Sequence, residues 1–156
     1  MERMHKLVGD LPTPEVGPPT VEVGATVADA IAVMRAHPVH SVVVTDEGAI
    51  AGIFTERDLL KRVFGRDLDP AATPVAEVMT PDPITLPMSA SIAYAINHMG
   101  VGGLSNVPVV DRDGKLVALV GVEEVVSHLD ELFADLESAR SVADPDSPWV
   151  DLGGGA

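Results

Sequence analysis

The sequence has 156 residues, of which 46% are hydrophobic and only 3% aromatic, and its formal net charge is −14. So much negative charge repels phosphate backbones, so we expect no nucleic-acid partner. The chain contains no cysteine, which excludes disulfides and thiolate chemistry. It has no apolar run of membrane-spanning length, so we expect a cytoplasmic protein without a membrane partner.

The chain contains an internal repeat. Residues 20–34 align without gaps on residues 85–99. The paired residues include Thr20 with Thr85, Val27 with Ile92, Ala30 with Ala95, and Met34 with Met99. A repeat of this length indicates one supersecondary unit made twice.

In the first copy, Thr26 and Asp29 have the spacing of a capping box and predict a helix that starts at Val27. Two apolar runs follow, at 41–45 and 49–54, separated by a turn, and a helix is predicted over 55–64. The second copy has a helix capped by Ser91, strands at 106–110 and 115–120, and a helix over 122–139. Each copy is therefore predicted to be a β-α-β-β-α unit, and the fold class is α/β (α+β).

These elements divide the chain into four predicted parts. Residues 1–64 form the first unit with an N-terminal segment, and residues 75–140 form the second unit with an extended C-terminal helix. Residues 65–74 are predicted to be a linker because they contain Pro70 and Pro74. Residues 141–156 are predicted to be a flexible acidic tail.

The segment Gly-Ile-Phe-Thr-Glu-Arg-Asp at 52–58 closes a strand and opens a helix. Thr55 and Asp58 form a second capping box, and their spacing alone favours this structural explanation. A helix N-terminus also attracts anions, and basic residues follow it closely. A carboxylate at Asp58 could accept hydrogen bonds from the vicinal hydroxyls of a ribose, with a phosphate near Thr55. The sequence leaves both explanations open.

The repeated unit, this motif, Met79-Thr80-Pro81 and the strand Val107–Asp111 together resemble the cystathionine beta-synthase (CBS) domain family. The resemblance is to a tandem pair, or Bateman module, of the stand-alone prokaryotic type. It implies two repeats packed sheet to sheet with pseudo-two-fold symmetry and a homodimer. It also implies a regulatory adenosyl ligand (AMP, ADP, ATP or S-adenosylmethionine) with no required cofactor.

In this family each cleft takes its Thr and Asp from one copy and its other walls from the second copy. The first cleft would then use Thr55 and Asp58, with Arg57, Lys61 and Arg62 as the basic residues nearest the phosphate. The sequence does not settle which of these three points inward. The second copy would supply Ile84, Ser105, Asn106 and Pro108.

The second cleft departs from the family pattern. Gly121 stands where the first copy has Thr55, and Glu124 stands where it has Asp58. Glu123 replaces the basic Arg57. We therefore expect this degenerate cleft to be empty or to prefer a less charged ligand. Its remaining wall would come from Val39, His40 and Ser41.

Other chemistry lacks a sequence signature. The five histidines are scattered. His37 and His40 are close in sequence, but no acidic ligand stands beside them and Pro38 breaks helical geometry, so we expect no metal site. The chain has neither a nucleophile elbow nor a glycine-rich phosphate loop, so we expect no enzyme. The leading hypothesis is a sensor that transmits adenosyl-ligand binding to an unknown client protein as a conformational change. The alternative is a dimerisation or interaction module with vestigial ligand sites.

Two predictions concern surfaces. Apolar positions on the first helix of each copy, namely Ile31, Met34, Ile96 and Met99, are expected to contribute to a homodimer interface. The helix over 122–139 carries a long apolar stripe. We expect its last turns, Leu132 to Leu136, to pack on a dimer partner or on the N-terminal segment Leu7–Leu11.

Overall fold

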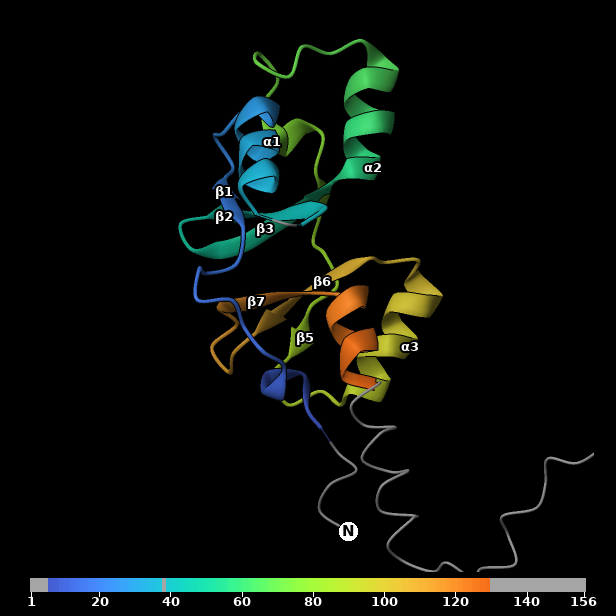
Figure 1. Ribbon diagram of the computed structural model, residues 1–156. Helices are drawn as coiled ribbons and strands as arrows, with labels where there is room; N and C mark the ends of the chain where they lie inside the picture. Colours follow the sequence, from blue (N-terminus) through green and yellow to red (C-terminus); the bar gives the residue numbers. More distant parts are fainter. Residues whose placement is uncertain (1–5, 38, 130–156) are drawn as a thin grey trace, which may run out of the picture. The chain divides into compact units, whose positions relative to one another are not determined.

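The computed structural model describes residues 6–37 and 39–129, which form two small sheets with helices (Figure 1). The first sheet has the order β1-β2-β3-β4 and the second has the order β5-β6-β7. The strands are β1 (Thr20–Glu22), β2 (Ser41–Asp46), β3 (Ala49–Thr55), β4 (Thr80–Pro81), β5 (Leu86–Pro87), β6 (Asn106–Val110) and β7 (Leu116–Gly121).

The two sheets repeat one pairing pattern. In each, a short strand runs parallel to a second strand, which pairs antiparallel with a third. The registers also correspond, since Ser41 pairs with Thr55 in the first sheet and Asn106 pairs with Gly121 in the second. The predicted fold class of two α/β repeats is confirmed.

Capping side chains start the first helix of each repeat. At α1 (Val27–Ala36) the Asp29 N–H donates to Thr26 Oγ1 at 3.2 Å, and the Thr26 N–H donates to Asp29 Oδ2 at 2.9 Å. These bonds from Thr26 to the carboxylate lower the pKa of Asp29. At α3 (Ile92–Gly102) Ser91 Oγ accepts the Tyr94 N–H at 3.2 Å. Both predicted helix starts are therefore correct.

The helix that follows β3 is less regular than the sequence suggested. It begins as α2 (Glu56–Asp58), widens into a π-helical turn over Leu59–Val63, and ends in a 3₁₀ turn over Phe64–Arg66. π-Helical turns often occur near functional sites. The widened turn begins directly after Asp58, the carboxylate of the predicted ligand motif.

Each repeat has its own apolar core, and each core or sheet takes a piece of chain from outside its repeat. Val8 and Leu11, around the 3₁₀ turn Val8–Asp10, are buried in the core of the second repeat. The Val8 N–H donates to the Ala90 carbonyl at 2.8 Å. In the other direction, β4 follows the linker but pairs with β3 of the first sheet. Another 3₁₀ turn, Val75–Glu77, leads into β4.

The apolar helix positions expected at a dimer interface divide into two groups. Met34 and Met99 are buried in the cores of their own repeats, because α1 and α3 each pack on a sheet of the same chain (Figure 1). Ile31 is partly buried against the core of its own repeat, whereas Ile96 is 37% exposed. Residues 122–129 are helical as predicted. The rest of that prediction, including Leu132 to Leu136 and the tail, lies outside the described residues.

The described helices contain no segment that is both long and apolar enough to cross a bilayer.

Candidate functional site: a cavity lined by both repeats

A cavity of about 520 Å³ is lined by residues of both repeats. This volume is within the range of roughly 300–1,000 Å³ found for small-molecule sites. Of the nine residues predicted for the first cleft, Lys61 does not line it and the other eight do: Thr55, Arg57, Asp58, Arg62, Ile84, Ser105, Asn106 and Pro108. The structure therefore brings these residues together, while their role in binding a nucleotide stays a prediction.

Strand ends place the polar groups of this cavity. Thr55 is the last residue of β3, and α2 starts directly after it, so that Asp58 lies one turn further on. Asn106 and Pro108 belong to β6, and Ser105 precedes that strand. Ile84, just before β5, is 48% exposed and supplies an apolar wall. One side of the cavity is thus polar and one side partly apolar.

The capping box at Thr55 and Asp58 is present. Asp58 Oδ2 accepts the Thr55 N–H at 3.0 Å and the Thr55 hydroxyl at 3.1 Å, while the Asp58 N–H donates to Thr55 Oγ1 at 3.2 Å. The other carboxylate oxygen, Oδ1, has only longer contacts, 3.4 Å to the Thr80 hydroxyl and 3.5 Å to Arg62 Nε. Oδ1 is therefore the oxygen with capacity to accept a further donor.

The three basic candidates differ in what they contact. Arg62 lines the cavity, but its Nη1 donates to the Met79 carbonyl at 2.8 Å and to the Val78 carbonyl at 3.3 Å. Arg57 also lines the cavity, and across residues 6–37 and 39–129 it has no hydrogen bond or ion pair. Lys61 is not among the lining residues. Of the two candidates that line the cavity, Arg57 is thus the one whose charge is uncommitted.

Four polar residues of this cavity were not predicted for it: His40, Glu56, Thr80 and Asp82. We had assigned His40 to the second cleft. Here its Nδ1 lies 2.9 Å from Glu56 Oε1, and this hydrogen bond, helped by the charges of Glu56 and Glu123, raises the pKa of His40. The pairing of Ser41 with Thr55 places the start of β2 beside the start of α2. That register could have indicated His40, but sequence patterns alone do not fix it.

The corresponding motif in the second repeat is built differently. Glu124 Oε2 accepts the Gly121 N–H at 2.9 Å, so the carboxylate folds back on the helix start. A Cβ atom at Gly121 would lie only 2.6 Å from this oxygen and 3.1 Å from Asn106 Oδ1. Of the five residues predicted for the second cleft, only His40 lines the cavity described above, and Ser41 is fully buried.

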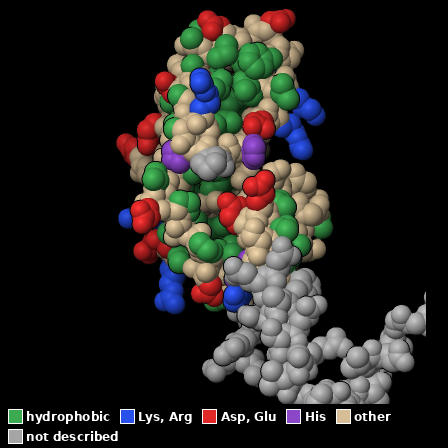
Figure 2. Space-filling model, in the orientation of Figure 1, with side chains coloured by type: hydrophobic (Ala, Val, Ile, Leu, Met, Phe, Trp, Pro, Cys, Tyr) green, Lys and Arg blue, Asp and Glu red, His purple; other side chains and the backbone are tan. Residues whose placement is uncertain are grey.

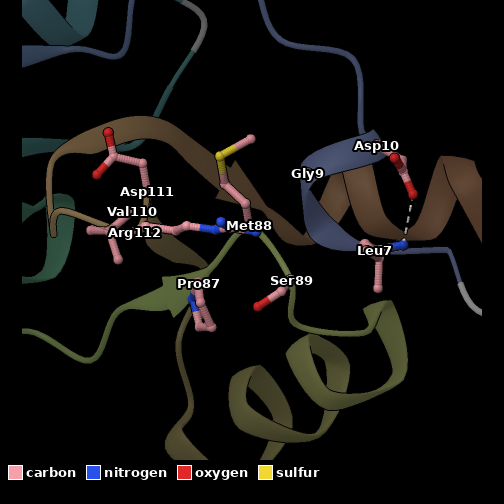
Figure 3. A pocket seen from close by; sticks show the side chains of 9 residues that line it. All are labelled: Leu7, Gly9, Asp10, Pro87, Met88, Ser89, Val110, Asp111 and Arg112. Atoms are coloured by element: carbon pink, nitrogen blue, oxygen red, sulfur yellow. Dashed lines mark hydrogen bonds between the residues drawn. The ribbon is translucent and has the colours of Figure 1, made fainter.

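A second cavity, of about 390 Å³, lies where the N-terminal turn meets the second repeat. Figure 3 shows the turn carrying Leu7 and Asp10 across from the segment carrying Pro87 to Ser89. The carboxylates here hold local structure: Asp10 accepts the Leu7 N–H at 3.0 Å, and Asp111 accepts backbone N–H groups of its own turn.

The described residues contain no cluster of His, Asp or Glu able to hold a metal ion.

The chain is thus built from a duplicated α/β unit, with one cavity lined by residues of both copies. The model of the CBS domain family matches residues 8–65 and again residues 75–131. The chain therefore belongs to the CBS-domain family and carries two copies of the domain.

Known proteins agree with this assignment. The chain is 32% identical over 122 residues to the meiotically up-regulated gene 70 protein of Schizosaccharomyces pombe, covering 78% of this chain but only 17% of that protein. The crystal structure of a CBS-domain containing protein from Agrobacterium tumefaciens matches with a TM-score of 0.69 and 30% identity, over 78% of this chain and 97% of the other. The structure of CBSX2 in complex with AMP matches with a TM-score of 0.68 and 25% identity, over 81% and 97% of the two chains.

Proposed function

We propose that this chain is a non-catalytic regulatory module that binds an adenosyl ligand, AMP, ADP, ATP or S-adenosylmethionine, in the cavity lined by both repeats. The observation that carries the proposal is the convergence of Thr55, Arg57 and Asp58 of the first repeat with the predicted wall residues of the second. The likeness to CBSX2, a protein whose structure contains AMP, supports an adenine nucleotide.

The contacts suggest how such a ligand would lie. The ribose hydroxyls would donate to Asp58 Oδ1, which is the less occupied carboxylate oxygen. The adenine would lie against the apolar surfaces of Ile84 and Pro108, and the phosphate would lie near Thr55 and the uncommitted Arg57. Each part of the ligand would thus meet a group of matching chemistry.

The same contacts offer a route for transmission to a client protein. Thr80 and Arg62 approach Asp58 Oδ1, and Arg62 also holds the carbonyls of Val78 and Met79. Arg62 lies in the last helical turns of the first repeat, and Val78, Met79 and Thr80 lie just after the linker, so these contacts join the two ends of the connection between the repeats. A ligand that favours one arrangement of this connection would shift the population toward it, and a client could recognise that arrangement.

The test is calorimetry with AMP, ADP, ATP and S-adenosylmethionine. Asp58→Ala should weaken binding at least about 10-fold, equivalent to about 1.5 kcal/mol for a charge-assisted hydrogen bond. Asp58→Asn, which keeps the shape, distinguishes lost binding from lost folding. Glu124→Ala is the matched control in the second repeat and should leave binding unchanged. Failure of every adenosyl compound to bind would overturn the proposal.

The second candidate is a dimerisation or interaction module with vestigial sites, which the altered second motif favours. We propose a homodimer in either case. Exposed apolar side chains of the second repeat support it: Tyr94, Ile96, Val101 and Val122. Light scattering at micromolar concentration tests it, because a monomer mass at that concentration would contradict it.

A further inference from the structure

The ligand cavity contains more acidic than basic side chains. Glu56, Asp58 and Asp82 line it, against Arg57 and Arg62. On the face of the molecule shown in Figure 2, Asp and Glu side chains are also more widespread than Lys and Arg. The cavity therefore lies in a surrounding that disfavours additional negative charge.

One of the two arginines is already used within the protein. Arg62 donates to two backbone carbonyls, and its Nε lies 3.5 Å from the carboxylate of Asp58. Moving this guanidinium to a ligand phosphate would leave the Met79 carbonyl without its 2.8 Å donor and Asp58 without its counter-charge. Such losses are costly when a carboxylate is buried, and Asp58 is 6% exposed.

Arg57 is then the single uncommitted guanidinium among the cavity residues. Its neighbour in sequence, Glu56, is acidic, and so is Asp82, which also lines the cavity. The Glu56 carboxylate is hydrogen-bonded to the His40 ring. When His40 is neutral, this bond leaves the negative charge of Glu56 without a counter-charge. Arg57 can pair with one phosphate group, but the lining offers no second free fixed cation for a β- or γ-phosphate.

We infer that this cavity selects an adenosyl ligand with no more than one phosphate group, so that AMP binds more tightly than ADP or ATP. The inference rests on the proposed function and names its ligand class. Each added phosphate brings negative charge close to Glu56 and Asp82 without a counter-charge. Close charge pairs near a protein surface are strong enough for AMP to exceed metal-free ATP by at least about 10-fold in affinity, with ADP between them.

The test is a series of titrations with adenosine, AMP, ADP and ATP in EDTA. The pH is about 9, well above the ordinary pKa of histidine, because the hydrogen bond to Glu56 raises the pKa of His40. Glu56→Gln combined with Asp82→Asn should reduce the preference for AMP over ATP to within about 3-fold, because it removes two negative charges. Asn is chosen at position 82 because it tolerates the positive φ of 47° found there.

Two single variants separate the role of Arg57 from net charge. Arg57→Gln should weaken AMP about 10-fold while changing adenosine less than about 2-fold, because adenosine has no phosphate to pair. Lys61→Gln removes the same charge from the same helical segment, outside the cavity lining, and should change neither ligand.

The outcomes separate the selectivity from the proposed function. Metal-free ATP binding as tightly as AMP would overturn the selectivity and leave the adenosyl site intact. Binding of none of the four compounds would overturn the proposed function, and this inference with it.

Discussion

The two motifs at 52–58 and 118–124 have one helix-capping contact in common and differ in the groups that we propose bind a ligand. In both, a carboxylate three residues on accepts the N–H of the residue that ends the strand, at 3.0 Å from Thr55 to Asp58 and 2.9 Å from Gly121 to Glu124. Only the first adds a hydroxyl that accepts the helix N–H. Both repeats therefore keep a carboxylate that caps the helix. Only the first repeat also has the threonine hydroxyl that we propose lies near a ligand phosphate.

The strands that carry the motifs also differ. β3 pairs with β4, which brings Thr80 to the carboxylate of Asp58, whereas in the described sheet of the second repeat β7 has a partner on one side only. The first motif is thus connected to the chain between the repeats. This difference suggests substitutions that should affect the two motifs unequally.

The largest expected effect on stability is at Gly52, which corresponds to Ala118 in the second repeat. A Cβ atom at Gly52 would lie 2.5 Å from Met79 Sδ and 2.8 Å from the Thr80 carbonyl oxygen. Gly52→Ala should therefore force β4 away from β3 and lower the free energy of unfolding by about 1–3 kcal/mol. Ala118→Gly is the control and should cost less than about 1 kcal/mol. Urea denaturation measures both, and equal costs would contradict the difference drawn between the strands.

A smaller effect is expected from the cap itself. Thr55→Val keeps the shape of the side chain but removes the hydroxyl that accepts the Asp58 N–H, so it should lower the free energy of unfolding by about 1 kcal/mol. Glu124→Gln keeps an acceptor for the Gly121 N–H and should cost less than about 0.5 kcal/mol. A cost for Glu124→Gln as large as that for Thr55→Val in thermal unfolding would show that the two caps are equivalent.

The smallest effect concerns pH. The hydrogen bond to Glu56 raises the pKa of His40, with further contributions from the charges of Glu56 and Glu123. The stabilisation by protonated His40 is therefore complete below its ordinary pKa of 6.5 and is lost as pH rises through the raised value. Both side chains are exposed, so the contribution should not exceed about 1 kcal/mol.

Unfolding of the wild type and of His40→Ala, followed between about pH 5.5 and 8.5, measures this contribution. The difference in free energy of unfolding between the wild type and His40→Ala should shrink as pH rises. In the Glu56→Gln background, most of the pH dependence of this difference should be lost. A difference that grows with pH would contradict the assignment.

The sequence carried enough information for the repeat and the helix caps, which follow from local spacing. The family resemblance also indicated eight residues that line one cavity, while their role in binding stays a prediction. It could not indicate that Arg62 is held by the Val78 and Met79 carbonyls, since this depends on long-range packing. For the same reason it did not indicate that Val8 and Leu11 are buried in the second core. Patterns of apolar residues identify a buried face but not the segment that covers it.

The central claim is that one motif of the pair forms the nucleotide site. Equilibrium dialysis of the full chain against saturating labelled AMP measures the number of bound molecules directly. We predict one AMP per chain at saturation for the wild type and for Glu124→Ala. With the free AMP concentration set near the wild-type Kd, we predict that Asp58→Ala binds at least about 5-fold less AMP than the wild type. Two AMP molecules per chain, or undiminished binding by Asp58→Ala, would contradict the claim.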